Sequence, residues 1–181
     1  VEAVAWVPRV AGGDRKHFEE SLTAEIGDDV FVRNLSRDGS LRRAPDGDQF
    51  YPIASTFPID PNRDLLGLNI QSDQERSVAL LRALSSGTPV ATGPLTSLVA
   101  EEGDEAGPVL TVFVPIYDAY ASRARRPRGA VMGVFRVSDL IHEALRLFAD
   151  DITVRVYDVT SPTNRRLMWE VGEAEADAPF R

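Results

Sequence analysis

The chain has 181 residues, of which 43% are hydrophobic, so it suits one domain or two small lobes that share a core. A formal net charge of −8 disfavours a nucleic-acid partner, because binding to nucleic acid requires a basic surface. The lack of cysteine excludes disulfides and thiolate metal sites, and no run reaches the roughly 20 apolar residues of a membrane span.

Residues 1–8 are rich in apolar side chains, and the chain begins without Met. We interpret the chain as a segment of a longer protein, in which flanking membrane helices can anchor it. Residues 1–8 fit either the end of a helix or a short strand, and Pro8 ends both because it cannot donate to a backbone ladder. From residue 14 to Gly27, the four-residue spacing of Phe18, Leu22 and Ile26 predicts a surface helix with one buried edge.

The middle of the chain predicts short strands around one clear helix. Strands are expected over Val30–Leu35 and Phe50–Pro58, separated by a turn region rich in glycine and charge. Residues 64–92 then predict a strand, a helix and a strand, with Leu65–Ile70 as the apolar run of the first strand.

The helix within residues 64–92 has recognisable ends. Ser72 is its predicted N-cap, because Glu75 three residues later completes a capping box, and Gly87 is expected to end the helix in a left-handed conformation. Its polar face should keep Arg76 in water. The apolar face is expected to bury Val78, Leu80, Leu81 and Leu84.

The next segments alternate between charged loops and apolar strands. The acidic loop 101–105 is interpreted as solvated, since it lacks the ligand order of a calcium loop, which is the less favoured alternative. Val109–Tyr117 is the most hydrophobic strand and is expected at a central position. It pairs with a strand over 129–136 through the basic loop 123–128, for which solvation is preferred to contact with phosphate or lipid headgroups.

The C-terminal third predicts a helix over 138–150, capped by Ser138, and two strands over 152–157 and 166–171 that start a second small sheet. The helix is expected to bury Leu140, Ile141, Ala144, Leu145 and Phe148 and to leave His142 in solvent. Short strands joined by hairpins, with helices laid on one face, indicate an α+β fold on an antiparallel, PAS-like sheet.

An enzyme is hard to argue from these residues. Without cysteine, and with His17 and His142 on charged helices, neither a Cys/His nor a Ser/His/Asp site has a credible member. No glycine-rich loop has the spacing that cradles phosphate. We therefore expect no catalytic residue, no metal ligand and no cofactor.

Seven short segments occur in an order that resembles the CHASE domain, a sensory extracellular domain associated with cyclases and histidine kinases. They are Trp6–Val10, Phe18-Glu19, Tyr51–Ile53, Leu66–Asn69, Gly87 with Pro89–Thr92, Phe113–Tyr117 and Gly133–Arg136. The resemblance implies a bacterial member, distantly similar to the sensor domain of plant cytokinin receptors and set between two transmembrane helices.

The resemblance also implies an anatomy of two PAS-like lobes. Residues 1–13 would be the end of an N-terminal stalk helix that mostly lies outside this chain. Residues 14–137 would form the complete, ligand-holding membrane-distal lobe. Residues 138–181 would be a connecting helix and a smaller membrane-proximal lobe.

The predicted ligand site follows partly from this resemblance. Cytokinin-binding relatives use an aspartate at the position of Asn69, and an amide both donates and accepts hydrogen bonds, so recognition of adenine is not expected to carry over unchanged. They also use a backbone carbonyl that falls near Ala91. Apolar walls with a few polar groups suit a small ligand. We predict a pocket lined by Tyr51, Phe57, Asn69, Ala91, Thr92, Thr111, Phe113 and Phe135.

Two functions of different classes remain open. In the first, the domain binds a small molecule, adenine-like or another small metabolite, on the periplasmic or extracellular face of the membrane. Binding would shift a homodimer, joined through the stalk helix, and control a cytoplasmic histidine kinase, diguanylate cyclase or adenylate cyclase. In the second, side chains fill the pocket, and the domain is a ligand-free dimerisation or partner-docking module.

Overall fold

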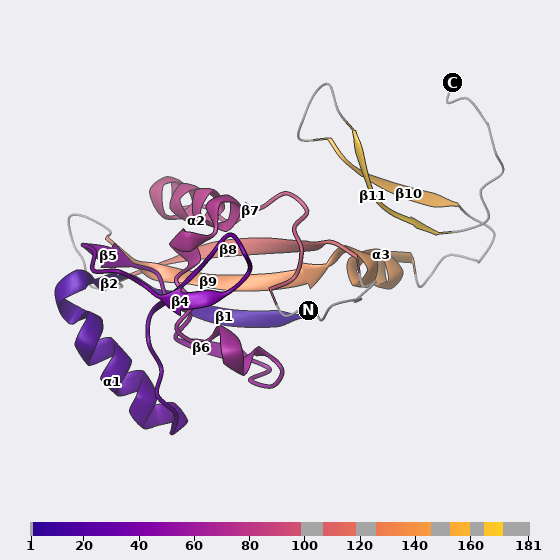
Figure 1. The fold of residues 1–181 in the computed structure, drawn as a ribbon. Coiled ribbons are helices and arrows are strands. Elements are labelled where there is room, and N and C mark those ends of the chain that lie inside the picture. The colour runs from indigo at the N-terminus through magenta and orange to yellow at the C-terminus, as the bar shows by residue number, and fades with distance from the viewer. Residues whose placement is uncertain (1, 99–106, 119–125, 146–152, 160–164, 172–181) are drawn as a thin grey trace.

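A computed structural model describes residues 2–98, 107–118, 126–145, 153–159 and 165–171. Within them the main element is an antiparallel sheet of five strands in the order β6-β1-β9-β8-β7 (Figure 1). The strands are β1 (Ala3–Pro8), β6 (Ser55–Phe57), β7 (Val90–Ala91), β8 (Val109–Tyr117) and β9 (Pro127–Arg136). The prediction of an α+β fold on an antiparallel sheet is confirmed.

The start of the chain is a strand and not the end of a helix. β1 lies between β6 and β9 and pairs with β9 along its whole length, from Ala3 opposite Val134 to Pro8 opposite Gly129. The helical alternative for residues 3–8 is therefore wrong, and a stalk helix over residues 1–13 does not hold for them. The alternation of buried Ala3, Ala5 and Val7 with more exposed neighbours is the two-residue period of a strand.

The first helix and the small sheets beside it are close to expectation. α1 (Arg15–Ile26) ends at Gly27 as predicted, and the φ of this glycine is 86°, in the left-handed region. β2 (Val10–Ala11) pairs with β5 (Gln49–Phe50), and β3 (Arg33–Leu35) pairs with β4 (Leu41–Arg43). The strand predicted over Phe50–Pro58 is split between β5 and β6, and the buried residues Tyr51 and Ile53 between them form backbone hydrogen bonds with residues 67–70.

The apolar run Leu65–Ile70 is not a strand. It passes from η2 (Asn62–Leu65) into η3 (Ile70–Ser72), with single bridges to β3 and to Pro52. Gly67 explains the interruption: its φ is 81°, and a Cβ built there would lie 2.2 Å from the backbone oxygen of Phe31. The run is buried by close approach to residues 30–33 and not by a continuous ladder.

The helix α2 (Gln74–Ser86) is confirmed, with its C-terminus at Gly87. Its N-cap is Asp73, whose carboxylate accepts from the Arg76 backbone N–H at 2.9 Å, and not Ser72. The buried face is rotated from the predicted one, since Val78 and Leu81 are exposed and Arg76 is buried. The residues that pack inward are Ala79, Leu80, Ala83 and Leu84.

The C-terminal elements also match the predicted order. α3 (Val137–Leu145) follows β9 directly, so Ser138 lies inside it and is not its cap, and Leu140 and Ala144 are exposed rather than buried. His142 is exposed as predicted, with its ring 5.1 Å from that of Trp169. β10 (Val154–Asp158) and β11 (Arg166–Val171) form the separate two-stranded sheet. Residues 146–150, the acidic loop 101–105 and residues 123–125 of the basic loop lie outside the described residues.

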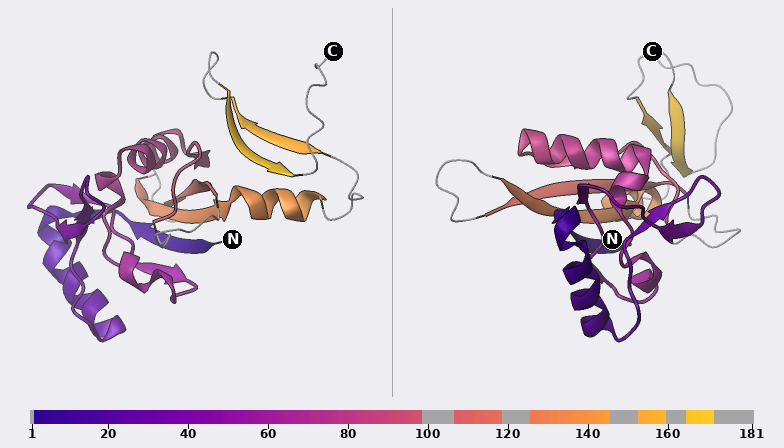
Figure 2. Two further views of the ribbon diagram at one scale, coloured as in Figure 1. Left: turned by 45° about the vertical axis from the view of Figure 1, so that its right-hand side comes forward. Right: turned by 60° about the vertical axis from the view of Figure 1, so that its left-hand side comes forward.

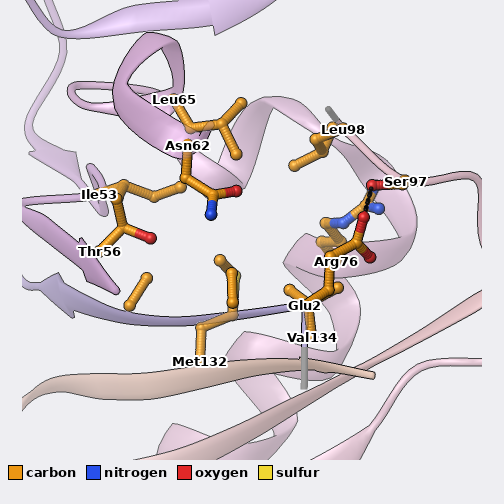
Figure 3. Close-up of a pocket in the computed structure, with 12 residues that line it drawn as sticks. Glu2, Ile53, Thr56, Asn62, Leu65, Arg76, Ser97, Leu98, Met132 and Val134 are labelled. Atoms are coloured by element: carbon orange, nitrogen blue, oxygen red, sulfur yellow. Dashed lines mark hydrogen bonds between the residues drawn. The ribbon is translucent and has the colours of Figure 1, made fainter. Parts of the chain in front are cut away.

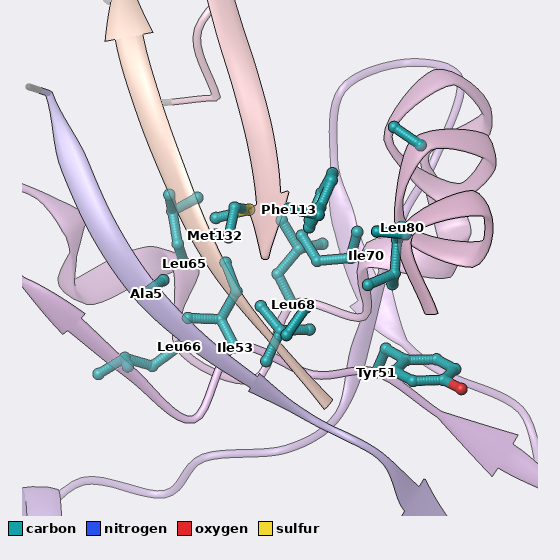
Figure 4. Packing of buried hydrophobic residues seen from close by; sticks show 14 of the residues in the cluster. Ala5, Tyr51, Ile53, Leu65, Leu66, Leu68, Ile70, Leu80, Phe113 and Met132 are labelled. Atoms are coloured by element: carbon teal, nitrogen blue, oxygen red, sulfur yellow. The ribbon is translucent and has the colours of Figure 1, made fainter. Parts of the chain in front are cut away.

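The main sheet has one packed face and one exposed face. Its inner face, with Ala5, Phe113 and Met132, packs against Leu80 of α2 and the buried run around Leu68 (Figure 4). β8 lies inside the sheet, as expected, while β9 holds the middle position. The outer face carries exposed apolar side chains, namely Val4, Phe57, Val114 and Ile116.

The N-terminal end of β1 and the start of α3 lie at the same end of the sheet, because Ala3 pairs with Val134 (Figure 2). α1 lies at the opposite end. The chain therefore enters and leaves the main sheet side by side.

Candidate ligand-binding site

Asn69, the main polar residue of the predicted pocket, makes both of its side-chain hydrogen bonds to other residues of the protein. Its Oδ1 accepts from the Tyr51 backbone N–H at 2.9 Å, and its Nδ2 donates to Asn34 Oδ1 at 3.0 Å. Because Asn69 is buried, these two partners supply the hydrogen bonds that water would supply to an exposed amide. As a ligand contact Asn69 stays a prediction.

Three other predicted residues point away from the packed core. Phe57, on the edge strand β6, is 77% exposed, and Ala91 of β7 is exposed. Phe135 lies on the outer face, since it pairs with Leu110, one residue from the inward-facing Thr111. The structure thus does not bring the side chains of Phe57 and Phe135 together with Asn69. The predicted contact of Ala91 is through its backbone carbonyl and stays a prediction.

The remaining four predicted residues lie on the inner side of the sheet. Tyr51 and Phe113 belong to the hydrophobic core. Thr92 Oγ1 accepts from the Thr111 backbone N–H at 3.1 Å, which joins the residue after β7 to β8. The buried Thr111 Oγ1 has no hydrogen-bond partner among the described residues.

A small cavity lies elsewhere on the inner face, and none of its lining residues is among the predicted site residues. Its floor is formed by β1 and β9, and its other walls come from η2, α2 and residues 97–98 (Figure 3). Its volume is ≈ 20 Å³, which is enough for about one water molecule. The apolar lining is Ala3, Ala5, Ile53, Leu65, Leu98, Met132 and Val134.

Two charged side chains reach this cavity from one wall. The Glu2 side chain is 8% exposed, and its Oε1 accepts from Ser97 Oγ at 2.8 Å and from Arg136 Nη2 at 3.2 Å. Arg76 is 4% exposed and donates from Nη1 to Asp73 at 2.6 Å and from Nη2 to the Thr96 carbonyl at 2.8 Å. Glu2 Oε2 and Arg76 Nε are buried and have no partner in the described part of the chain.

Asn62 lies on the opposite wall of the cavity (Figure 3). It is 1% exposed, and its Nδ2 donates to the Pro58 carbonyl at 3.0 Å. Its Oδ1 is buried without a partner in the residues described. A buried polar atom left unpaired costs roughly 1–3 kcal/mol, and more where it is charged, so three such atoms on residues that line one cavity favour a polar occupant there.

Sequence reasoning missed these three residues for identifiable reasons. Arg76 follows a capping signal, so its position predicts the solvent-exposed face of α2. Glu2 resembles an ordinary charged residue near a chain end. Asn62 stands in the Asp60-Pro61-Asn62 turn, where asparagine is common. Their convergence depends on long-range contacts between β1, η2 and α2, which no local pattern encodes.

A second buried network shows the contrasting case of charges that are fully used. Glu19 of α1 accepts from Arg15 Nε at 2.8 Å and from the Val32 backbone N–H at 2.9 Å. Burial raises the pKa of the Glu19 carboxyl, but the hydrogen bonds from Arg15 and Val32 outweigh it, so the net pKa is lowered. Arg15 also donates to the Ala44 carbonyl at 2.8 Å. This network fastens α1, and no buried side-chain atom of Arg15 or Glu19 lacks a partner within the described residues.

Comparison with known families now identifies the domain. The model of the CHASE domain family matches residues 1–169. The chain belongs to the CHASE domain family. CHASE domains are sensory, and the kinase and cyclase activities of proteins that carry them belong to other domains.

Three relatives of this CHASE domain are signalling proteins. It is 27% identical over 172 residues to "Probable histidine kinase 4" of Oryza sativa subsp. japonica, which covers 93% of this chain and 16% of the relative. It is 24% identical over 189 residues to "Hybrid signal transduction histidine kinase A" of Dictyostelium discoideum, covering 98% of this chain and 9% of the relative. "Adenylate cyclase, germination specific" of the same organism is 27% identical over 85 residues, covering 46% and 10% respectively.

This CHASE domain therefore spans less than a fifth of the length of each of these relatives. None of the helices within the described residues is both long and apolar enough to cross a bilayer.

Proposed function

We propose that this CHASE domain senses a small molecule on the periplasmic or extracellular side of a membrane, as part of an integral membrane receptor. The parent receptor would carry a histidine kinase, diguanylate cyclase or adenylate cyclase as its cytoplasmic output. Residues up to 137 would form a membrane-distal PAS-like lobe, and α3 with β10 and β11 would lead into a smaller proximal lobe.

The observation that carries this proposal is the small cavity on the inner face of the main sheet. Glu2, Asn62 and Arg76 each place a buried, unpaired polar atom in the walls of one apolar cavity. Unpaired polar atoms are a cost in the walls of a pocket that only side chains fill. Each of these three atoms gains a hydrogen bond when a ligand supplies the partner.

The same residues suggest how binding is transmitted. Glu2 stands directly before β1, and its ion-pair partner Arg136 is the last residue of β9, directly before α3. A ligand that engages Glu2 alters the pairing between the entry and the exit of the main sheet. In a dimer joined through a stalk helix, this shifts the arrangement of the two copies if one arrangement binds the ligand more tightly.

A thermal-shift screen of small metabolites against two matched variants tests the proposal. Ala3→Leu adds three carbons to the cavity floor, whereas Val4→Leu adds one carbon on the outer face of the same strand, away from the cavity. We expect a ligand at about 100 times its dissociation constant to stabilise the wild type by roughly 2.7 kcal/mol. The Val4→Leu variant should keep this shift, and Ala3→Leu should lose it.

Two outcomes would count against the proposed site. If a ligand stabilises Ala3→Leu as much as the wild type, sensing takes place elsewhere in the domain. If a broad library of adenine derivatives, amino acids, carboxylates and sugars shifts no melting temperature, the sensor function itself fails.

A ligand-free dimerisation or docking module is the second candidate function. The observation in its favour is the outer face of the sheet, where Val4, Phe57, Val114 and Ile116 are exposed. Exposed apolar side chains gathered on one face mark a protein–protein contact more often than scattered ones do.

A further inference from the structure

The chemistry of the cavity walls restricts the class of ligand, and this step rests on the proposed sensing function. Glu2 Oε2 is an anionic acceptor, and Arg76 Nε is a cationic donor. Figure 3 shows the two side chains close together on one wall, next to Ser97. A ligand that satisfies both atoms must present a donor and an acceptor at the same end.

The charges of Glu2 and Arg76 restrict the class of ligand further. Glu2 has its countercharge in Arg136, and Arg76 has its countercharge in Asp73. A ligand with only a negative charge would therefore be repelled by Glu2, and a ligand with only a positive charge would be repelled by Arg76. A zwitterion complements both Glu2 Oε2 and Arg76 Nε. Hydrogen bonds between ionised groups are about twice as strong as neutral ones, so the zwitterion gains most.

We propose that the ligand of this cavity is a small α-amino acid in its zwitterionic form. Its ammonium group donates to Glu2 Oε2, and its carboxylate accepts from Arg76 Nε. The side chain lies along Met132 and Val134 towards Asn62, whose Oδ1 accepts from a donor at the far end.

Size explains why the occupant is small and why one wall must move. The cavity volume of ≈ 20 Å³ holds about one water molecule, which is less than any amino acid needs. Residues 97–98 form one wall of the cavity, and this wall is held by the Ser97 bond to Glu2 and by the bond from Arg76 to the carbonyl of Thr96. The ligand therefore engages the same two charged residues that hold this wall, and the wall moves outward as the ligand enters.

Calorimetric titration with L-alanine and L-serine tests the ligand class. N-acetyl-L-alanine lacks the ammonium group and L-alaninol lacks the carboxylate, so each loses one charge-assisted hydrogen bond. We expect each analogue to bind at least tenfold more weakly than L-alanine, which corresponds to about 1.4 kcal/mol. L-serine should bind at least as tightly as L-alanine, because its hydroxyl can donate to Asn62.

The variant Glu2→Gln tests the assigned partner. It should weaken L-alanine at least tenfold, while Glu20→Gln, at an exposed position of α1, should leave the affinity unchanged. The analogue series on the wild type decides the question if Glu2→Gln does not fold.

The outcomes separate this inference from the proposed function. An adenine derivative or a dicarboxylate that binds in place of amino acids, with the binding lost in Ala3→Leu, overturns the zwitterion and leaves the sensor intact. Equal affinity for L-alanine and its two analogues also overturns it. If no compound of any class binds, the sensor function fails and the ligand class falls with it.

Discussion

At the scale of single residues, Asn69 illustrates a buried amide that serves the fold. It joins the segment before Tyr51 to β3, through its bonds to the Tyr51 backbone and to Asn34. We expect Asn69→Ala to lower the free energy of unfolding by about 1–3 kcal/mol, because the Tyr51 N–H is then buried and unpaired. Urea unfolding measures this loss.

Ligand binding provides the control for that variant. Asn69 does not line the small cavity, so the affinity of Asn69→Ala for a cavity ligand should match that of the wild type. The opposite pattern, little change in stability with loss of the ligand-induced shift, would restore Asn69 as the contact that the family resemblance implies.

At the scale of elements, α1 is held by ion pairs as well as by apolar packing. Its buried residues include Arg15 and Glu19, and Arg43 adds a third charge at 3.2 Å from Glu19. Because the pKa of Glu19 is lowered by folding, its contribution is present above the unfolded value of about 4.3. It is lost as the pH falls through the folded value.

Glu19→Gln tests this dependence. At neutral pH the variant should lose roughly 3 kcal/mol of stability, because Arg15 is left as a buried charge without its partner. Below about pH 4.3 the wild type should lose stability more steeply than the variant, and Glu20→Gln should follow the wild type. Urea unfolding between pH 3 and pH 7 measures both effects, and parallel curves for wild type and Glu19→Gln would contradict the assigned role.

The elements also show what a sequence can and cannot predict here. Helices α1 and α2 were found because their periodicity and terminal glycines are local signals. The sequence does not predict which face of α2 is buried, because Asp73 and Ser72 both suit an N-cap. Only the packing of α2 on β8 and β9 decides how the helix is rotated about its axis. The run Leu65–Ile70 was predicted as a strand because burial alone makes it apolar, whereas Gly67 turns it away from any ladder.

The candidate site divides along the same line. Thr111 and Phe113 are two residues apart in β8 and lie on the packed face, while their contact with a ligand stays a prediction. The outward position of Phe135 follows from its pairing with Leu110, which the sequence does not reveal. Only the fold brings Glu2, Asn62 and Arg76 to a common cavity.

At the scale of the whole molecule, the two faces of the sheet separate the two candidate functions. The cavity lies on the inner face, and the exposed Phe57 and Val114 lie on the outer face. If the outer face pairs with a second copy, sedimentation of the wild type should show association that depends on concentration. The double variant Phe57→Ser with Val114→Ser should weaken that association at least tenfold, because it removes apolar area from the contact.

The same double variant should bind a cavity ligand with unchanged affinity, since neither residue lines the cavity. Ligand binding and association are coupled only if the ligand alters the association constant, and by linkage association must then alter the ligand affinity by the same factor. A sensor predicts such a coupling factor different from one. A docking module predicts association in the absence of any ligand effect, so titration of the wild type in the monomeric and the associated state decides between them.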